Sequence, residues 1–363
     1  VTDFITAADS IEFKGGTLYV KETGVSIATS NGAVTINSID GDHDETVTID
    51  AGSGAVSVGR IGGTNASGEG IKSVAITSTH ATGITLTGNI TTSDTADSDV
   101  TLTGKVVING DVDIDTSAGT DGDITFTSTI VGADGTNDDL ILDTGGGALT
   151  FHATTTIGAG DSPLSTLDIA QGGGTVALTI PQIGDASDDG VSGVVRIGTA
   201  TSTSVTMRDQ TYRFGTGNVT ITADTTGTIF STTGNSTVDL AGGNFLITGA
   251  AKVSNGTLDI NSAGGDIEIT GAIVGHTGGD EILILDDNSG GSSTAVITLG
   301  GNVGADAGSA SLLKSVTAIA KGGIKLSGDI TTSSTADGAV TLTGPVTLEA
   351  DVIIDADAAN TTV

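Results

Sequence analysis

The stretch Val100–Ser128, "VTLTGKVVINGDVDIDTSAGTDGDITFTS", contains three short runs in which apolar residues alternate with Thr or Asp. These runs are "VTLTG" at Val100–Gly104, "DVDIDT" at Asp111–Thr116 and "DITFTS" at Asp123–Ser128. A period of two is typical of a strand with one face toward a core and the other toward water. Gly, Asp, Asn and Ser, which separate the runs, are turn residues. The stretch therefore predicts short β-strands joined by tight turns.

The same pattern recurs at a regular spacing along the chain. Strands are expected to start near Asp113, Ile124, Leu140, Leu149, Leu167 and Ala177, after an earlier series near Val47, Val56, Val74, Ile84 and Val100. Short and long steps alternate, and a pair of steps adds to about 26 residues, which is typical of a solenoid. We therefore predict an all-β fold, a parallel β-helix of about 14 coils that stack about 4.8 Å apart into an elongated rod. Ala307–Ala320 comes nearest to an amphipathic helix, but its counterparts elsewhere in the chain read as strands, and we interpret it as strand.

A longer repeat overlies the coils. Gly83–Ala118 matches Gly323–Ala358 at 22 of 36 positions, and Asp113–Asp143 resembles Asp259–Asp286. The single continuous β-solenoid expected over residues 1–363 then consists of repeat segments at about 5–89, 90–234 (with extra coils near 182–233), 235–329 and a partial segment at 330–363. An uncovered coil exposes strand edges that invite pairing. We therefore expect either a longer chain that continues beyond both termini or subunits that associate end to end.

Composition limits the possible functions. The chain has 57 Gly, 7 Phe and 2 Tyr, and no Trp or Cys, so disulfides and thiol chemistry are excluded. Its 44 acidic residues against 12 basic ones give a net charge of −32. This charge argues against nucleic acid as a partner, because nucleic acid attracts basic surfaces. No run approaches the roughly 18 apolar residues of a membrane helix, so we expect no membrane insertion.

Acidic segments are the first candidates for a binding site. The densest are "DGDHDE" at Asp40–Glu45, "NDD" at Asn137–Asp139, "DASDDG" at Asp185–Gly190 and "DEILILDD" at Asp280–Asp287. The calcium repeat G-G-x-G-x-D-x-U-x does not occur in register, and we interpret these segments as structural turns. We predict no cofactor. Calcium held by turn carboxylates is the alternative, with Asp185, Asp188, Asp189, Asp280, Asp286 and Asp287 as its candidate ligands.

Other motifs that carry chemistry are absent from the sequence. The four histidines lie far apart and form no H-x-x-x-H pair. No G-x-S-x-G elbow occurs, and the Gly-rich stretches lack the Lys of a phosphate loop. We therefore predict no catalytic residue.

One local group combines both charge signs with an aromatic ring. It lies in "MRDQTYRF" at Met207–Phe214 and consists of Arg208, Asp209, Tyr212 and Arg213. β-Helix polysaccharide lyases and hydrolases need clustered acids and, in the lyases, a basic residue, so this group is the candidate sugar-binding or catalytic patch. The competing interpretation is an ion-paired strand in which Tyr212 and Phe214 cover part of the core.

The phrases "VTLTGKVVINGDVDIDTSAG", "LILDTGGGALTF" and "QTYRFGTGNVTITADTT" resemble the repeats of filamentous-haemagglutinin-like adhesins and related β-strand-repeat proteins of bacterial surfaces. This resemblance covers nearly the whole chain. It implies that the β-helix is right-handed and that the protein is exported to the bacterial cell surface or an extracellular matrix. It brings no catalytic residues with it.

Together these features predict a non-catalytic structural or adhesive rod of an extracellular fibre, surface adhesin or biofilm matrix. The alternative is a β-helix protein that binds or degrades carbohydrate, and matrix or cell-surface polysaccharide is a candidate partner in either case. An ice-binding solenoid would need a more regular Thr-x-Thr face. A string of immunoglobulin-like sandwiches would need repeats of uniform length, whereas the segments that start near Ile90 and Asn235 lie 145 residues apart.

Overall fold

A computed structural model describes residues 3–63, 70–93, 98–118, 122–133, 137–160, 162–171, 177–202, 204–222, 228–276, 279–287, 293–304, 312–333 and 338–358. The chain divides into two compact units, Val1–Gly184 (unit 1) and Asp185–Val363 (unit 2). The described residues contain strands and no helix, and their parallel sheets stack as a β-solenoid. The predicted fold class, an all-β parallel solenoid, is thus confirmed.

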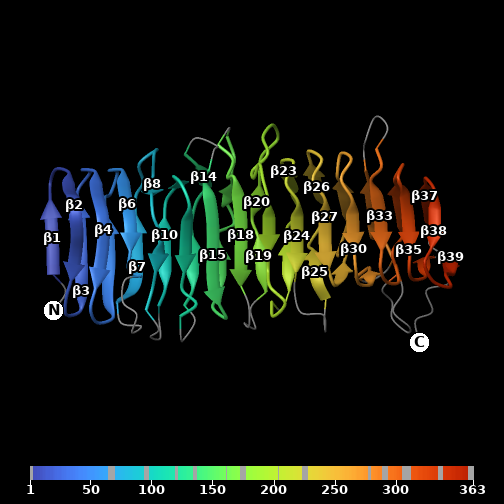
Figure 1. Ribbon diagram of the computed structural model, residues 1–363, viewed down its shortest axis with the longest axis horizontal. Helices are drawn as coiled ribbons and strands as arrows, with labels where there is room; N and C mark the ends of the chain where they lie inside the picture. The colour runs from blue at the N-terminus through green and yellow to red at the C-terminus, as the bar shows by residue number, and fades with distance from the viewer. Residues whose placement is uncertain are drawn as a thin grey trace. The chain divides into compact units, whose positions relative to one another are not determined.

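One parallel sheet of unit 1 contributes a strand to each successive coil, and Figure 1 shows these strands following one another from blue to green. Its inward residues form a ladder of register partners, Ile5, Ile27, Ile49, Ile76, Leu102, Phe126 and Phe151. Similar side chains therefore stack directly on one another, and the Phe126 and Phe151 rings lie 5.7 Å apart between centroids. The strands are β1 (Asp3–Ala7), β3 (Gly24–Thr29), β5 (Glu45–Asp50), β7 (Ile71–Thr77), β10 (Val100–Thr103), β13 (Ile124–Phe126) and β16 (Leu149–Phe151).

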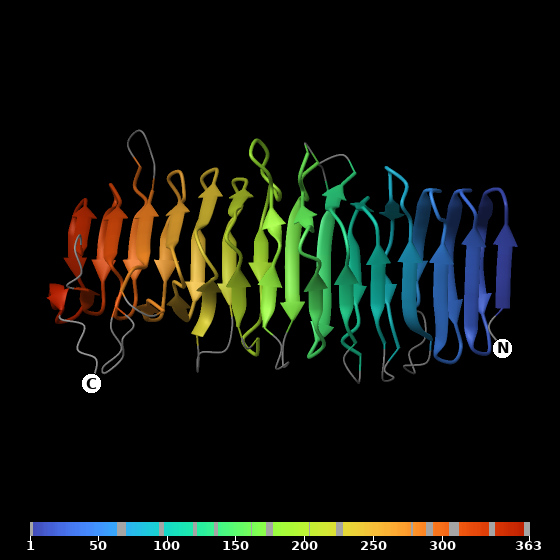
Figure 2. The same ribbon diagram turned by 180° about the vertical axis from the view of Figure 1, so that it is seen from behind.

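The number of strands on the remaining sides of the coils in unit 1 changes along the stack. Figure 2 shows these coils from behind. The first coils use one long strand each, whereas the later coils divide this side into two short strands that pair separately, β8 with β11 and β9 with β12. The coil thus has two strands at first and three later. These strands are β2 (Ile11–Val20), β4 (Val34–Gly41), β6 (Val56–Ile61), β8 (Ile84–Leu86), β9 (Ile90–Thr91), β11 (Val106–Ile108), β12 (Val112–Asp115), β14 (Ile130–Gly132), β15 (Asp139–Gly145), β17 (Thr156–Ile157), β18 (Thr166–Gln171) and β20 (Gln182–Ile183). β19 (Leu178–Ile180) instead lies next to β16, on the side of the first sheet.

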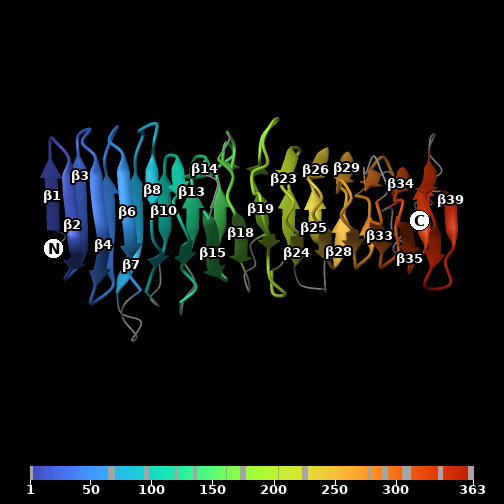
Figure 3. The ribbon, with the colours of Figure 1, turned by 45° about the horizontal axis from the view of Figure 1, so that its top comes forward.

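Unit 2 repeats the three-strand coil, and Figure 3 shows its rungs from green to red. One side is β21 (Val195–Ile197), β24 (Val219–Thr222), β27 (Phe245–Thr248), β30 (Ile267–Ile269), β33 (Val296–Leu299), β35 (Gly323–Leu326) and β38 (Val346–Leu348). The second is β23 (Thr211–Phe214), β26 (Ser236–Leu240), β29 (Thr257–Asn261), β32 (Ile282–Asp286), β34 (Ser315–Ile319) and β37 (Ala339–Thr343). The third is formed by β22 (Val205–Met207), β25 (Thr228–Thr232), β28 (Ala250–Lys252), β31 (Ile273–Val274), β36 (Ile330–Ser333) and β39 (Ile354–Ala358).

Coil length varies more than the sequence spacing indicates. Register partners lie 22 residues apart from Val238 to Ile260 but 33 apart from Leu285 to Ala318. Because loops lengthen several coils, the solenoid has about 12 turns rather than the expected 14 or so. Ser315–Ile319 is a strand, as expected for this part of 307–320, while residues 307–311 lie outside the described part of the chain.

Asp and Asn residues at the corners connect successive coils. In unit 1, Oδ1 of Asp99 accepts the backbone N–H of Asp123 at 2.9 Å, and Oδ1 of Asp123 accepts that of Ala148 at 2.7 Å. Such side chains satisfy backbone donors that precede a strand and would otherwise lack a partner. Unit 2 has the same ladder at Asn218, Asn244, Asp266, Asn302 and Asp329. Much of the acidic and amide content of the sequence therefore has a structural use.

Glycine is required where the chain leaves a strand close to the preceding coil. Gly104 has φ 119°, and a Cβ there would collide with the carbonyl oxygen of Ser78. Gly344 ends the second copy of the phrase "VTLTG", with φ 135°, and a Cβ there would collide with the carbonyl oxygen of Ala320. Only glycine combines this φ with the absence of a Cβ.

The sequence repeats and the compact units do not share boundaries. The division after Gly184 falls inside the predicted repeat segment 90–234, at the start of its predicted extra coils near 182–233. The repeat segments are defined by sequence similarity, whereas the units are defined by the density of contacts in the fold. The boundaries of the units therefore do not test those of the repeat segments.

Candidate functional site

The candidate patch Arg208, Asp209, Tyr212 and Arg213 lies in unit 2, at the turn between β22 and β23 and on β23 itself. Tyr212 is completely buried, and its hydroxyl accepts the backbone N–H of Arg208 at 2.8 Å. This burial raises the pKa of the Tyr212 phenol well above its usual value. The ring therefore belongs to the core, together with buried Phe214, and it is not available at the surface for stacking on a sugar.

Arg213 is held between acidic residues of neighbouring coils. Its guanidinium Nη2 lies 3.6 Å from Oδ2 of Asp239 on the next coil. On the other side it faces Asp189: burial raises the pKa of that carboxyl, while the positive charge of Arg213 acts in the opposite direction. Arg213 thus pairs with the following coil, as the ion-paired interpretation of this strand predicts.

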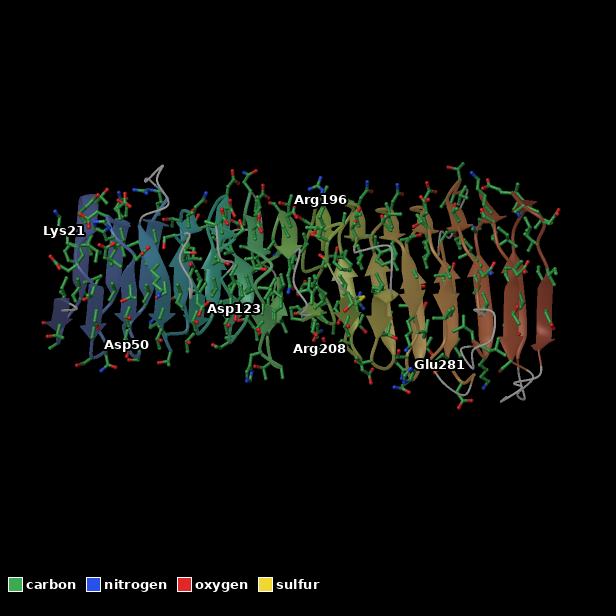
Figure 4. All side chains as sticks on the ribbon, turned by 90° about the horizontal axis from the view of Figure 1, so that it is seen from below. Lys21, Asp50, Asp123, Arg196, Arg208 and Glu281 are labelled. Atoms are coloured by element: carbon green, nitrogen blue, oxygen red, sulfur yellow. The ribbon has the colours of Figure 1, made fainter. Side chains whose placement is uncertain are left out.

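Arg208 and Asp209 pack against the following coil. The carbonyl of Arg208 accepts the hydroxyl of Ser236 at 2.8 Å. Asp209 packs against Gly234, and a Cβ at Gly234 would lie 2.8 Å from Cβ of Asp209. Figure 4 shows Arg208 and Arg196 on opposite sides of unit 2, so these two arginines do not form one basic patch.

The calcium candidates fall into two groups. Oδ1 of Asp185 accepts the backbone N–H groups of Ser187 and Asp188 at 2.9 and 3.0 Å, so this carboxylate closes its own turn. Asp287 is buried, and its Oδ2 accepts the backbone N–H of Lys321 at 2.9 Å.

The other candidates do not complete a metal site around these two. Asp286 lies on β32, Asp280 is exposed before that strand, and Asp188 and Asp189 follow the Asp185 turn. Within the described ranges, no three acidic or histidine residues come together in a way that could hold a metal ion.

Three buried carboxylates form a feature that sequence reasoning did not separate from the other acidic turns. Glu45, Asp138 and Glu281 are each buried, and each lies at or just before the start of a strand, namely β5, β15 and β32. Each also lies against a glycine at the end of the preceding strand, so that a Cβ at Gly132 would come within 2.7 Å of Oδ2 of Asp138. All three belong to acidic segments noted in the sequence, "DGDHDE", "NDD" and "DEILILDD". The additional signal is the glycine four to six residues before the acid.

These carboxylates organise loops. Both carboxylate oxygens of Glu45 accept the backbone N–H of His43, at 3.0 and 2.9 Å. Asp138 accepts the N–H of Ala133 from its own loop at 2.8 Å and that of Gly110 from the preceding coil at 3.0 Å. Burial, followed by the neighbouring Asp42, raises the pKa of Glu45. The bonds to the loop backbone give these acids a structural use.

A shallow groove of about 280 Å³ lies on the outer surface of unit 1, over β12, β15 and the start of β18, with Asn89 at its edge. It is lined by Asn89, Asp111, Val112, Asp113, Asp139, Ile141 and Thr166. Ile141 is 40% exposed, at a strand position where the coils usually carry Thr or Asp. Burial, and then the charges of Asp115 and Asp143, raise the pKa of Asp113. No sequence motif marked this groove, because its residues come from four successive coils.

Comparisons of the chain with known proteins found no relative. The chain matches no protein-family model, and no curated protein or solved structure is significantly similar to it. The described residues contain no helix that is long and apolar enough to cross a membrane.

Proposed function

We propose that this chain is a structural, non-catalytic β-solenoid of a bacterial extracellular fibre, cell-surface adhesin or biofilm matrix. One observation carries the proposal. The polar residues that could supply chemistry are used to connect coils: Asp and Asn form the corner ladders, Glu45 and Asp138 close loops, and Arg213 pairs with Asp239. A chain in which backbone bonds and side-chain ladders run in one direction is suited to bearing load and resisting proteases.

The acidic surface fits this role. A net charge of −32 keeps neighbouring molecules apart and favours solubility. Export to the cell surface or matrix belongs to the same proposal, and matrix polysaccharide is its candidate adhesion partner. No cofactor is part of the proposal, and calcium at the turns is the alternative that a chelator tests.

We further propose that the coil containing β37 and β38 is covered by another parallel coil, from the same chain or from a second subunit. Val346 and Leu348 are 43% and 56% exposed, although they stand at strand positions that are buried elsewhere in the solenoid. An unpaired strand edge next to such side chains favours the addition of a strand.

Electron microscopy of the purified protein tests the structural proposal. We expect elongated particles or filaments that persist after treatment with a chelator. Compact globules would contradict a rod, and loss of order on chelation would show that calcium is required.

A carbohydrate-active protein is the second candidate, and only the Arg208–Arg213 group favours it. Turnover and binding of acidic polysaccharides should be measured for the wild type and for a variant with Arg208→Ala and Arg213→Ala. We expect no turnover by either protein. Turnover that the double variant loses would overturn the structural proposal, and binding without turnover would identify an adhesion partner.

A further inference from the structure

Five carboxylates on two adjacent coils lie beside the outward-facing Ile141 on unit 1, and Asp168 of the following coil is its register partner on the other side. Asp111, Asp113 and Asp115 belong to β12 and the residue before it, while Asp139 and Asp143 belong to β15. Register pairs Asp113 with Ile141 and Asp115 with Asp143, so the acids stand on adjacent coils around one apolar side chain. We call these five carboxylates and Ile141 the acidic groove. In the part of the chain that the structure describes, no salt bridge joins any of the five to a basic residue.

Two of these carboxylates have unused hydrogen-bonding capacity. Oδ1 of Asp113 and Oδ1 of Asp139 are shielded from solvent, and neither accepts a hydrogen bond. A buried acceptor without a donor is unfavourable, because it has lost its hydrogen bonds to water. The Cβ–Cγ torsion of Asp is broad, so a small rotation presents either oxygen to a donor in the groove. A donor that reaches the acidic groove therefore gains more here than at an ordinary exposed Asp.

Unit 2 contains a similar arrangement in which one carboxylate, Asp239, is paired with a basic residue. Asp259 pairs in register with Ile284, just as Asp113 pairs with Ile141. In unit 2, however, Arg213 pairs with Asp239, and the amide Nδ2 of Asn261 donates to Asp239 at 2.9 Å. Asp239 of unit 2 thus receives a cationic donor from within the fold. The donors that reach the acidic groove of unit 1 are neutral: Ser117 bonds Oδ1 of Asp115, and the N–H of Gly145 bonds Oδ1 of Asp143. Oδ1 of Asp259, like Oδ1 of Asp113, accepts no hydrogen bond.

We propose that the acidic groove is a docking surface for a basic segment of a partner protein, which places a Lys or Arg side chain over Ile141. Such a side chain has an aliphatic stem that matches the exposed Ile141 and a charged head that carries several donors. Arg fits best, because its planar fork bonds two carboxylate oxygens at once. The proposal rests on the groove alone and does not depend on the function proposed above.

Other occupants use less of the site. A bare metal ion gains nothing from Ile141, and no three carboxylates of the described residues converge on one point. A neutral sugar can donate hydroxyls, but it leaves the five negative charges without compensation. A polyamine has the right charge and a short apolar stem, so it serves as a competitor in the test.

The test is fluorescence anisotropy of a labelled hexa-arginine peptide at physiological salt, with the full chain and three variants. The first variant carries Asp113→Asn and Asp139→Asn, and the second carries Ile141→Thr. The third is a matched control with Asp9→Asn and Asp351→Asn, which removes the same charge from exposed carboxylates that form no side-chain hydrogen bond or ion pair with any described residue. Circular dichroism checks that each variant is folded.

We expect at least tenfold weaker binding for the first variant, about threefold for Ile141→Thr and less than twofold for the control. Equal losses in the first variant and the control would overturn the proposal, because binding would then reflect net charge alone. An absence of peptide binding to the wild type would also overturn it. A photo-cross-linking version of the peptide should label residues 111–113 and 139–141, and labelling spread over both units would contradict a single surface. Spermidine that binds the wild type tighter than the peptide and loses affinity in the first variant would assign the groove to polyamines instead.

Discussion

Gly83–Ala118 in unit 1 and Gly323–Ala358 in unit 2 have nearly the same sequence but different surroundings. In the first copy, Val106 and Ile108 are completely buried. Their counterparts Val346 and Leu348 are 43% and 56% exposed. The strands agree, since β10 matches β37 and β11 matches β38 within a residue. The two copies thus form the same secondary structure and bury it to different extents.

The difference comes from the coil that follows. In unit 1, β13 and β14 pair with β10 and β11 and cover their inward side chains. In unit 2, none of the described strands pairs with β37 or β38 on the far side from β34 and β35. Both copies contact the preceding coil. The comparison therefore separates the burial that the preceding coil provides from the burial that the following coil provides.

The largest expected effect is the loss of a side chain from the covered copy. Leu102→Ala removes a buried side chain between Ile76 and Phe126 and should lower the unfolding free energy of unit 1 by about 3 kcal/mol. Leu342→Ala, at the matching but half-buried position, should cost less than about 1 kcal/mol. Urea unfolding with hydrogen exchange assigns each loss to its coil, and equal losses would mean that β37 is covered in solution.

Glycine at the strand end should matter equally in both copies. Gly104→Ala and Gly344→Ala each place a Cβ against a carbonyl of the preceding coil, at a positive φ. We expect each substitution to cost about 2 kcal/mol. Thermal melts of both variants check this, and a harmless Gly344→Ala would show that the last described coil is not seated on its predecessor.

The corner ladder should also be equally strong in both copies. Oδ1 of Asn89 accepts the N–H of Asp113 at 3.0 Å, and Oδ1 of Asp329 accepts that of Ile353 at 2.8 Å. Replacing either residue by Ala should cost about 1 kcal/mol. Asp329→Asn keeps the oxygen and is the control. Protection of the N–H groups of residues 113 and 353 against hydrogen exchange reports each bond, and unchanged protection in the Ala variants would exclude the ladder as its source.

The smallest expected effect concerns Asp113, where the second copy has Ile353. Burial and the charges of Asp115 and Asp143 raise the pKa of Asp113. The folded state therefore binds this proton more tightly than the unfolded state, and the stability that Asp113 contributes at low pH is lost as pH rises through its folded-state pKa. Asp113→Asn should stabilise unit 1 at pH 7 by on the order of 0.5 kcal/mol after solvent screening.

This gain should shrink to zero at pH values well below 4, where Asp113 is protonated in both states. Urea midpoints measured at pH 7 and at pH 3 check the sign. Asp50→Asn, at an exposed residue whose Oδ1 bonds the N–H of Gly52, is the control for a general charge effect. A gain that persists at pH 3 would contradict the assignment to Asp113.

The alternation of apolar and polar residues located most of the longer strands. Expected starts near Ile124, Leu140 and Leu149 fall within a residue of β13, β15 and β16. The strands β11 (VVI), β14 (IVG) and β17 (TI) were not expected, because they lack the apolar–polar–apolar alternation of the equally short β13 (ITF) and β16 (LTF). The third side of the coil was therefore not predicted from the sequence, and only the pairing of its strands in the structure reveals it.

The candidate site was less predictable. Tyr212 and Arg213 differ by one position, and alternation along β23 turns the first into the core and the second toward Asp239. That assignment follows from the strand pattern once the register is known. The acidic groove cannot be found from the strand pattern, because its residues come from coils more than 20 residues apart and share no local motif.

Local sequence was sufficient for the strands, the turns and the parallel coil, since alternation and turn chemistry act over a few residues. Burial was not predictable in this way. Whether "VTLTG" is covered, whether an acid such as Asp138 is buried or exposed, and whether five aspartates lie around Ile141 all depend on the neighbouring coils. A strand in a solenoid is completed by residues roughly 25 positions away, so its environment is known only when the stack is formed.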